Sequence, residues 1–255
     1  MSPAYQWLRC DTLGDSCSPI AGATQATYLP TADDVGSTIR VVVTMENDVG
    51  YGSSTSVQTL QIQPPPPANT IKPVITGTPK PGTDLTTTTG TWVGGDPIAY
   101  ETSWLRCDED GASCVAILDA SGLKYTLRDD DVGHTVRARV AATNPTMTAT
   151  RDSDPTGVVI ALVPANTAKP TVGTIESGVK ARQGVDLIGA GGTWAGTSPM
   201  TFTYQWQRCA SATDCSDIPG ATGLTYTLTA DDVARRVRLL VVATNVGGRQ
   251  AVASV

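Results

Sequence analysis

One short pattern occurs three times in this chain, and the repetition limits the fold more than any other feature. In each copy an alternating stretch with a tryptophan ends in a cysteine, and a second cysteine follows six or seven residues later. The copies are YQWLRCDTLGDSC (5–17), TSWLRCDEDGASC (102–114) and YQWQRCASATDC (204–215). Their tryptophans, Trp7, Trp104 and Trp206, are 97 and 102 residues apart. This period is too long for common solenoid repeats and is typical of a small domain copied in tandem.

The residues between the copies favour strands and turns. Glycine (25 residues) and proline (17 residues) mark turns, threonine and valine are frequent, and no segment has a convincing helical stripe of apolar residues. Three stretches alternate in a way that predicts strands with one inward face. The inward residues are Ile39, Val41, Val43 and Met45; Val136, Ala138, Val140 and Ala142; and Val237, Leu239, Val241 and Ala243. We therefore predict an all-β fold of tandem antiparallel Greek-key sandwiches.

The repeats predict the domain organisation. Residues 1–63 form an incomplete repeat, and the four consecutive prolines at 64–67 form a stiff, extended linker. Residues 68–163 form the complete repeat. Residues 164–255 form a third repeat with a shortened last strand, and its first residues, PANT, repeat the PANT of residues 67–70.

Individual strands are also expected at particular places. In the complete repeat, two opening strands are predicted within 73–78 (PVITGT) and 84–92 (DLTTTTGTW), and a closing strand at 157–162 (GVVIAL). In the first repeat, a second strand is predicted within 20–30 and a last strand at 53–62.

The six cysteines predict local disulfides. The pairs are Cys10–Cys17, Cys107–Cys114 and Cys209–Cys215. Zinc is the alternative ligand, but two cysteines per repeat make a poor tetrahedral set when the chain has a single histidine. Disulfides imply an oxidising compartment. In the loop-entropy model each closure contributes about 2.5 kcal/mol.

Charge and hydropathy disfavour several classes of protein. The net charge is −6, with 18 basic and 24 acidic residues and no basic cluster, which argues against a nucleic-acid partner. No run of 18 apolar residues is present, so we expect no membrane span, and the first residues do not resemble a signal peptide.

Several motifs together resemble a known family. They are the Y-x-W-x-R-C strand, the acidic corners Asp34-Val35-Gly36 and Asp131-Val132-Gly133, and the V-x-V-x-A-x-N strand. The whole chain is similar to the tandem immunoglobulin-like or fibronectin-III-like repeats of bacterial surface or secreted proteins. This resemblance implies Ig-like sandwiches, with the first repeat lacking its opening strands. Two features depart from it: no cysteine pair bridges the two sheets as in antibody domains, and Ala234 replaces the corner glycine.

Each tryptophan strand ends in an arginine that is expected to pair with the acidic corner, because these two ends are close in an Ig-like topology. A partly buried guanidinium needs such a partner. The expected pairs are Arg9 with Asp33 or Asp34, Arg106 with Asp130 or Asp131, and Arg208 with Asp231 or Asp232. Calcium at these corners is the alternative, but it requires six or more oxygen ligands.

The tryptophans are the remaining candidates for a binding surface. Trp104 and Trp206 share the faces of Tyr100 and Tyr204 and are expected in the core. Trp92 and Trp194 follow glycines that permit a bulge, so they form a candidate ligand surface. With one histidine, paired cysteines and no phosphate-binding loop, we expect no enzymatic activity and no cofactor.

The first functional hypothesis is an extracellular or cell-surface segment that acts as a spacer or an adhesive binding module. The second is a subunit of a self-assembling filament or virion structure that uses strand complementation. The third is a carbohydrate-binding module. Proteins, including further copies of this chain, are the expected partners, with glycans as the alternative.

Both terminal repeats are expected to be incomplete. Aligned on its tryptophan, the first repeat has no counterparts of 73–78 and 84–92. Aligned on its last asparagine, the third repeat stops opposite Val57, before a counterpart of 58–62. Either the chain is a piece of a longer array or another subunit supplies strands. We predict that a neighbouring chain or a missing segment covers the first repeat.

Overall fold

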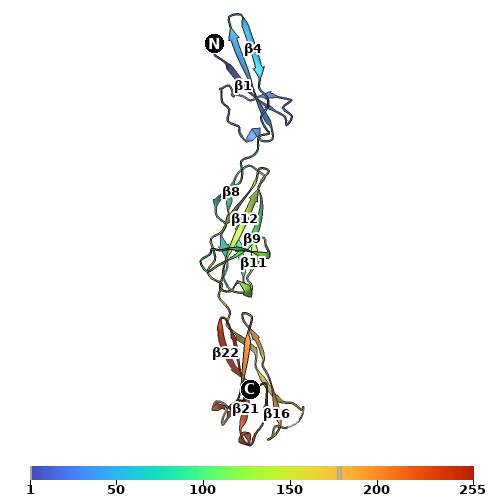
Figure 1. Ribbon diagram of the computed structural model, residues 1–255, viewed down its shortest axis with the longest axis vertical. Coiled ribbons are helices and arrows are strands. Elements are labelled where there is room, and N and C mark those ends of the chain that lie inside the picture. Colours follow the sequence, from blue (N-terminus) through green and yellow to red (C-terminus); the bar gives the residue numbers. More distant parts are fainter. Residues whose placement is uncertain (1, 177, 179) are drawn as a thin grey trace.

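The computed structural model describes residues 2–176, 178 and 180–255, and it is built from β-strands and three short 3-10 turns. Figure 1 shows three β-units in a row, with the N-terminus in the first unit and the C-terminus in the third. The strands pair antiparallel throughout, apart from one isolated parallel bridge between Val132 and Val159. The predicted all-β, antiparallel fold is confirmed.

The second unit has the arrangement of an Ig-like sandwich. Its larger sheet has the strand order β10-β9-β12-β13, its smaller sheet has the order β11-β7-β6, and β5 pairs with β8. The bounds are β5 (Ala68–Ile71), β6 (Ile75–Thr76), β7 (Asp84–Thr87), β8 (Thr91–Val93), β9 (Ala99–Cys107), β10 (Val115–Ser121), β11 (Lys124–Thr126), β12 (Thr135–Thr143) and β13 (Thr148–Asp152).

The third unit repeats this arrangement. Its sheets have the orders β19-β18-β21-β22 and β15-β16-β20, and β14 pairs with β17. The bounds are β14 (Ala165–Ala168), β15 (Thr171–Thr174), β16 (Asp186–Ala190), β17 (Thr193–Ala195), β18 (Thr201–Cys209), β19 (Cys215–Asp217), β20 (Thr225–Thr227), β21 (Arg236–Asn245) and β22 (Gly248–Ala253).

The first unit has a single described sheet, with the order β2-β1-β3-β4. The bounds are β1 (Ala4–Cys10), β2 (Ser18–Pro19), β3 (Thr38–Asn47) and β4 (Gly50–Thr55). Among the residues that the structure describes, no strand of the first unit corresponds to β6, β7 or β11. This unit is one half of a sandwich.

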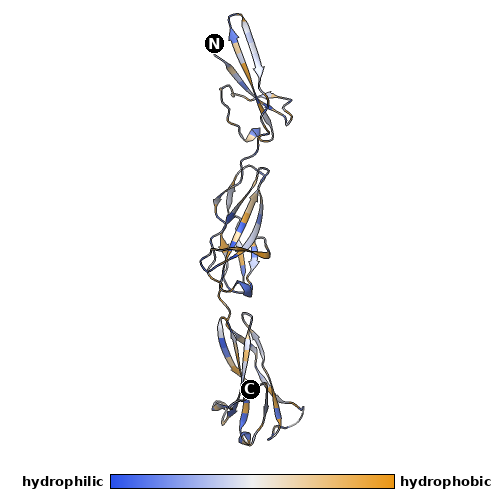
Figure 2. Cartoon of the chain, in the orientation of Figure 1, coloured by the Kyte–Doolittle hydropathy of each residue, from blue (hydrophilic) through white to orange (hydrophobic). Residues whose placement is uncertain are grey.

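The core of each complete unit lies between its two sheets. Trp104 on β9 is fully buried and packs with Val136 and Ala138 of β12 and with Leu85 and Tyr125 of the smaller sheet. The third unit has the same arrangement around Trp206. The alternation along the central strands explains it, because every second side chain points inward; Figure 2 shows apolar residues along these strands.

The first unit shows what the second sheet contributes. Trp7, Val41 and Val43 are half-buried, whereas their counterparts in the second unit, Trp104, Ala138 and Val140, are fully buried. At the next inward position Met45 is 43% exposed and Ala142 is 0% exposed. The inward face of the first unit is therefore partly open to water.

The predicted last strands are wrong in their positions. They are β4 and β13, which follow tight turns directly after β3 and β12, and not residues 53–62 and 157–162. Residues 153–159 instead contact β12 and the corner before it once every three residues: the amides of Ser153, Thr156 and Val159 donate to the carbonyls of Ala138, Val136 and His134. The hydroxyls of Ser153 and Thr156 accept the amides of Ala138 and Val136, so side chains replace backbone carbonyls. We call this segment, 153–159, the hydroxyl edge.

The strand predicted within 20–30 of the first unit is also wrong. Its counterparts β11 and β20 pair with β7 and β16. No described residue of the first unit offers such a partner, so this segment does not form a strand.

Leu85→Ala tests whether the smaller sheet holds the core together. The fully buried leucine leaves a cavity beneath Trp104, so the substitution should lower the free energy of unfolding of the second unit by about 2–5 kcal/mol. Amide hydrogen exchange of β9 and β12 in the full chain measures this loss. Leu118→Ala is the matched control, because Leu118 is 82% exposed and its loss should change exchange little. Equal effects of the two substitutions would contradict this account of the core.

Candidate functional site

Three 3-10 turns carry the acidic corners, and the last aspartate of each is the centre of a buried polar cluster. The turns are η1 (Ala32–Asp34), η2 (Asp129–Asp131) and η3 (Ala230–Asp232). In the second unit, Asp131 is 0% exposed, and both of its carboxylate oxygens have donors. Oδ1 accepts Arg106 Nε at 2.8 Å and pairs with Arg106 Nη2 at 2.7 Å. Oδ2 accepts the Tyr125 hydroxyl at 2.7 Å and the Arg128 amide at 2.8 Å.

The other two units repeat this cluster. Arg9 pairs with Asp34 and Arg208 with Asp232, each at 2.7 Å, and the hydroxyls of Tyr28 and Tyr226 donate to these carboxylates. In each corner the arginine pairs with the last aspartate, which is Asp34, Asp131 or Asp232. These three pairs are among those expected from the strand topology. The tyrosine was not predicted as a partner, although its fixed spacing, six residues before the aspartate, is visible in all three repeats.

The clusters act as structural caps. Burial alone would raise the pKa of Asp232, but hydrogen bonds from Arg208, the Thr229 amide and Tyr226 outweigh it and lower this pKa to about 2. Burial and the hydrogen bond to Asp131 raise the pKa of Tyr125 to about 12. Because protein donors already occupy the carboxylate oxygens, the corners offer little to calcium. Within the described residues, no group of three or more His, Cys, Asp or Glu could hold a metal ion.

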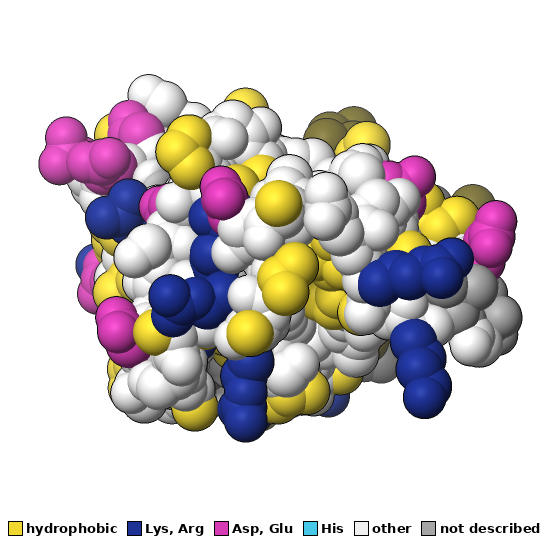
Figure 3. All heavy atoms as spheres, turned by 90° about the horizontal axis from the view of Figure 1, so that it is seen from below, with side chains coloured by type: hydrophobic (Ala, Val, Ile, Leu, Met, Phe, Trp, Pro, Cys, Tyr) yellow, Lys and Arg dark blue, Asp and Glu magenta, His cyan; other side chains and the backbone are white. Residues whose placement is uncertain are grey.

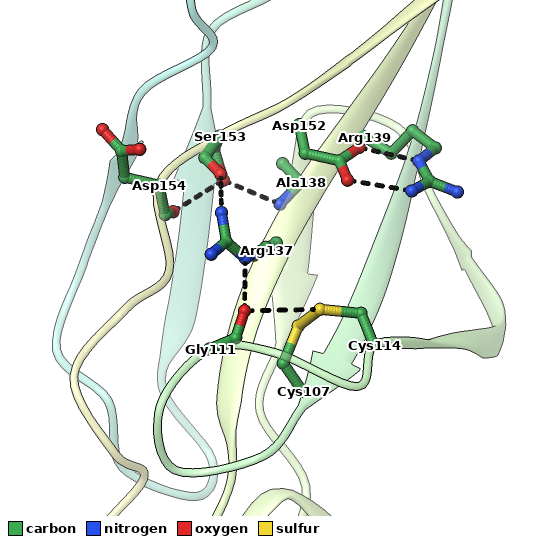
Figure 4. Close-up of polar contacts among 9 residues, drawn as sticks. All are labelled: Cys107, Gly111, Cys114, Arg137, Ala138, Arg139, Asp152, Ser153 and Asp154. Atoms are coloured by element: carbon green, nitrogen blue, oxygen red, sulfur yellow. Dashed lines mark hydrogen bonds and ion pairs between the residues drawn. A yellow bond between two sulfur atoms is a disulfide. The ribbon is translucent and has the colours of Figure 1, made fainter.

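The disulfide-closed loops lie beside these clusters. Three disulfides are present, Cys10–Cys17, Cys107–Cys114 and Cys209–Cys215. In the second unit, Figure 4 shows Arg137 between the loop and the hydroxyl edge. Its Nε donates to the Gly111 carbonyl at 3.0 Å and its Nη1 to the Ser153 carbonyl at 2.7 Å. Gly111 is required there, since a Cβ would lie 2.7 Å from the Pro155 ring.

The candidate ligand surface of Trp92 and Trp194 is only partly available. Both rings are half-buried, and their indole nitrogens donate at 2.9 Å to the carbonyls of Thr89 and Gly191. Trp92 lies beside Tyr100, and Trp194 beside Phe202, with ring centroids 6.4 and 6.1 Å apart. The two tryptophans belong to different units and do not form one surface.

The chain enters the second and third units through the same contacts. The Pro65 carbonyl accepts the Gly95 amide at 2.8 Å and Asn144 Nδ2 at 2.7 Å. In the third unit the Leu162 carbonyl accepts the Thr197 amide at 3.0 Å and Asn245 Nδ2 at 2.8 Å. These two asparagines were not predicted, although an asparagine stands at the end of the same strand, or directly after it, in all three copies.

The chain also leaves the first and second units through equivalent contacts. Ile62 exchanges backbone hydrogen bonds with Gly36 and Ser37, and Val159 does so with Gly133 and His134. These contacts complete the two joints between units.

In each joint, one residue without a backbone hydrogen bond separates the last hydrogen-bonded residue of one unit from the first of the next. In the first joint this residue is Gln63, because Thr146 Oγ1 donates to the Pro64 carbonyl. In the second joint it is Ala161. The Ile160 amide donates to the Pro79 carbonyl of the second unit, and the Leu162 amide donates to Thr197 Oγ1 of the third unit. A further hydrogen bond joins the second and third units directly, from the Ser198 amide to Asp129 Oδ2 at 2.8 Å.

Comparisons with known proteins found no matching family model. The 187-kDa microtubule-associated protein AIR9 of Arabidopsis thaliana is 26% identical over 246 residues, which is 96% of this chain. The chain spans only 14% of the length of that protein. In the described part of the chain, no helix is both long and apolar enough to cross a membrane.

Several solved structures are similar at low identity. The N-terminal four Ig domains of Dscam1 isoform 9.44 are 12% identical, with a TM-score of 0.29, over 98% of this chain and 64% of that one. Sidekick-1 immunoglobulin domains 1–5 are 15% identical, with a TM-score of 0.24, over 99% and 53%. Three N-terminal domains of the bacteriophage RB49 Highly Immunogenic Outer Capsid protein are 13% identical, with a TM-score of 0.23, over 100% and 86%.

Acid should weaken the third unit through Asp232. A carboxyl group whose pKa falls from 3.8 in the unfolded chain to about 2 in the folded unit stabilises folding above pH 4. This stability, about 2 kcal/mol, is lost as the pH falls from about 4 to about 2. Asp232→Asn should lower the stability of the unit at neutral pH and remove this part of its acid dependence.

Urea unfolding between pH 2 and pH 7, followed by hydrogen exchange in β21, measures the effect. Asp231→Asn is the control, because Asp231 is exposed and its loss should leave the acid dependence intact. An unchanged acid dependence in Asp232→Asn would contradict the assignment.

Proposed function

We propose that this chain is an extracellular spacer made of tandem Ig-like units, which holds the units in a row and presents their loops at a distance. Its units are residues 1–63, 68–163 and 164–255, with the prolines at 64–67 as the first joint. The resemblance to the repeats of bacterial surface and secreted proteins belongs to the same proposal. Three disulfides support an oxidising environment such as the extracellular space.

The joints carry this proposal. A flexible linker would leave several residues free to rotate, whereas each joint here has one residue whose backbone forms no hydrogen bond to either unit. The entering residues are also buried: Pro64, Pro67 and Pro164 pack into the unit that follows them. A proline fixes its own φ, so the buried prolines further restrict the chain at the point of entry.

The spacer role predicts a narrow distribution of distances between the units. Asn144→Ala and Asn245→Ala should broaden it, because each removes the amide that donates to the entering chain and to a second carbonyl of the same unit. Single-molecule energy transfer between dyes in the first and third units of the full chain measures the distribution.

The matched control is Asn47→Ala. Asn47 occupies the same position in the first unit and accepts the amides of Val49 and Gly50 in its turn, as Asn144 does for Thr146 and Met147. Asn47 lies at neither joint, so its substitution tests the turn without the linker and should leave the distances unchanged. A wild-type distribution as broad as that of the double variant would refute the spacer proposal.

A second candidate function is self-assembly by strand complementation. The half-open inward face of the first unit favours it, since the residues that the second sheet covers in the second unit are partly exposed here. Carbohydrate binding is the third alternative, for which Trp92 and Trp194 remain the candidate residues.

Self-assembly predicts that the apparent mass of the chain rises with concentration and that Trp7 becomes less accessible to a quencher as it does so. Sedimentation and acrylamide quenching measure both quantities. Met45→Ser should weaken the association, because it removes apolar area from the open face, whereas Met147→Ser in a turn of the second unit should not. A chain that stays monomeric with an ordered first unit and an accessible Trp7 would contradict this function.

A further inference from the structure

Two adjoining hollows lie on the larger sheet of the second unit, and Arg139 of β12 lines both of them. The first hollow has a volume of about 370 Å³, and its lining is mainly basic: Lys72, Arg137, Arg139, Arg151, Thr150 and Asp152. The second has a volume of about 450 Å³, and its lining includes Tyr100, Glu101, Ser103, Ser121 and Ala141.

Two carboxylates beside the first hollow are already paired. Arg139 donates to Asp152 through Nε and Nη2, at 2.7 and 2.8 Å. Lys72 pairs with Asp154 at 2.7 Å. These two ion pairs balance their own charges and leave the other cations of the hollow without a counter-charge.

Two further guanidinium groups make the first hollow positively charged. Arg137 is held by two backbone carbonyls, which do not neutralise it, as Figure 4 shows. Arg151 is exposed and forms no ion pair with any residue that the structure describes. Guanidinium groups bind oxyanions such as sulfate and phosphate well, so the hollow suits an anionic group. Figure 3 shows lysine and arginine side chains at the end of the third unit too, but there they are spread among apolar side chains.

The fold does not require the charges of Arg139 and Arg151. The strand register identifies the residues at the same positions of the other two units, and all of them are uncharged: Val42 and Leu240 for Arg139, and Ser54 and Val252 for Arg151. The frame of strands, disulfide and acidic corner is common to the three units, whereas this pair of arginines occurs in the second unit alone.

The second hollow also distinguishes this unit. Gln6 and Gln205 precede the tryptophans of the first and third units, and Nε2 of each donates to a backbone carbonyl beyond the disulfide-closed loop. The acceptors are the carbonyls of Ile20, at 2.9 Å, and Ile218, at 2.8 Å. Ser103 takes this position in the second unit, and its shorter side chain leaves the hollow open.

The lining of the second hollow suits a sugar. The hydroxyls of Ser103 and Ser121 and the carboxylate of Glu101 are partners for sugar hydroxyls, and the ring of Tyr100 is 44% exposed. A bound peptide would instead need apolar pockets for its side chains, and Ala141 is the only purely aliphatic side chain of this lining.

We infer that the second unit binds a saccharide that carries a sulfate or phosphate group. The anionic group pairs with Arg151 and Arg139 in the first hollow, and the sugar ring lies in the second hollow beside Ser103. Arg139 connects the two parts because it lines both hollows. This site goes beyond the spacer function and does not rest on it, and its residues differ from Trp92 and Trp194.

The probes are the 6-sulfates of glucose, galactose and N-acetylglucosamine, added to the isotope-labelled full chain at constant ionic strength. Inorganic sulfate and the three neutral sugars are measured under the same conditions. NMR should show saturable shifts of the amides of Ser103, Ala141 and Arg151 with at least one ester, at lower concentrations than with inorganic sulfate. The 6-phosphates of the same sugars test the other anionic group, and binding of either kind of ester supports the inference.

Two substitutions, each with a residue from another unit, separate the two parts of the site. Arg151→Val should weaken the binding of inorganic sulfate and of the esters about tenfold, because it removes a charged donor. Ser103→Gln should remove the preference for an ester over inorganic sulfate, because the glutamine fills the second hollow, while the affinity for inorganic sulfate stays the same. Arg249→Val is the matched control, since Arg249 is an exposed arginine on β22 of the third unit, and it should change neither affinity.

The amide spectrum of each variant also reports whether the second unit is folded. Gln6 and Gln205 show that the fold accommodates a glutamine at the position of Ser103. The inference is overturned if no ester causes saturable shifts, if the esters bind no more tightly than inorganic sulfate, or if Arg249→Val weakens binding as much as Arg151→Val does.

Discussion

The buried carboxylate of the acidic corner is the interaction on which each unit depends. Asp131 has its two oxygens inside the unit, where an unpaired charge would be strongly destabilising. Its donors come from β9 and from the continuous stretch of β11 and the turn, so satisfying the charge requires two separate segments to meet. Arg106 lies two residues after Trp104 and one residue before Cys107, where the disulfide-closed loop starts. One charge thus fixes the position of the core tryptophan and of the loop together.

Features that depend on local alternation could be predicted from the sequence. The inward faces of β12 and β21 follow from their period of two residues, and the disulfides follow from the closeness of each cysteine pair. The Arg106–Asp131 pair could be predicted because an Ig-like topology brings these two chain ends together. The choice between Asp130 and Asp131 could not be predicted, because only the capping geometry of the turn selects Asp131.

The errors have one physical origin, since each concerns a segment whose structure depends on a partner elsewhere in the chain. Residues 157–162 have the composition of a strand, but Ser153 and Thr156 replace backbone carbonyls with hydroxyls and set a spacing of three residues. Tyr28 lies in a sequence like that of β11, yet it forms no strand because no described partner like β7 is present in the first unit. The asparagines of the joints act on a linker about 80 residues earlier, which no local pattern reveals.

The hydroxyl edge connects the interior of a unit to the geometry of the array. Val159 is a core residue of the second unit, and it lies two residues before Ala161, the joint residue whose backbone forms no hydrogen bond. Closing the core and directing the chain toward the next unit are therefore one event. It follows that the orientation of the third unit depends on the packing of the second, because Val159 cannot leave the core without releasing the joint.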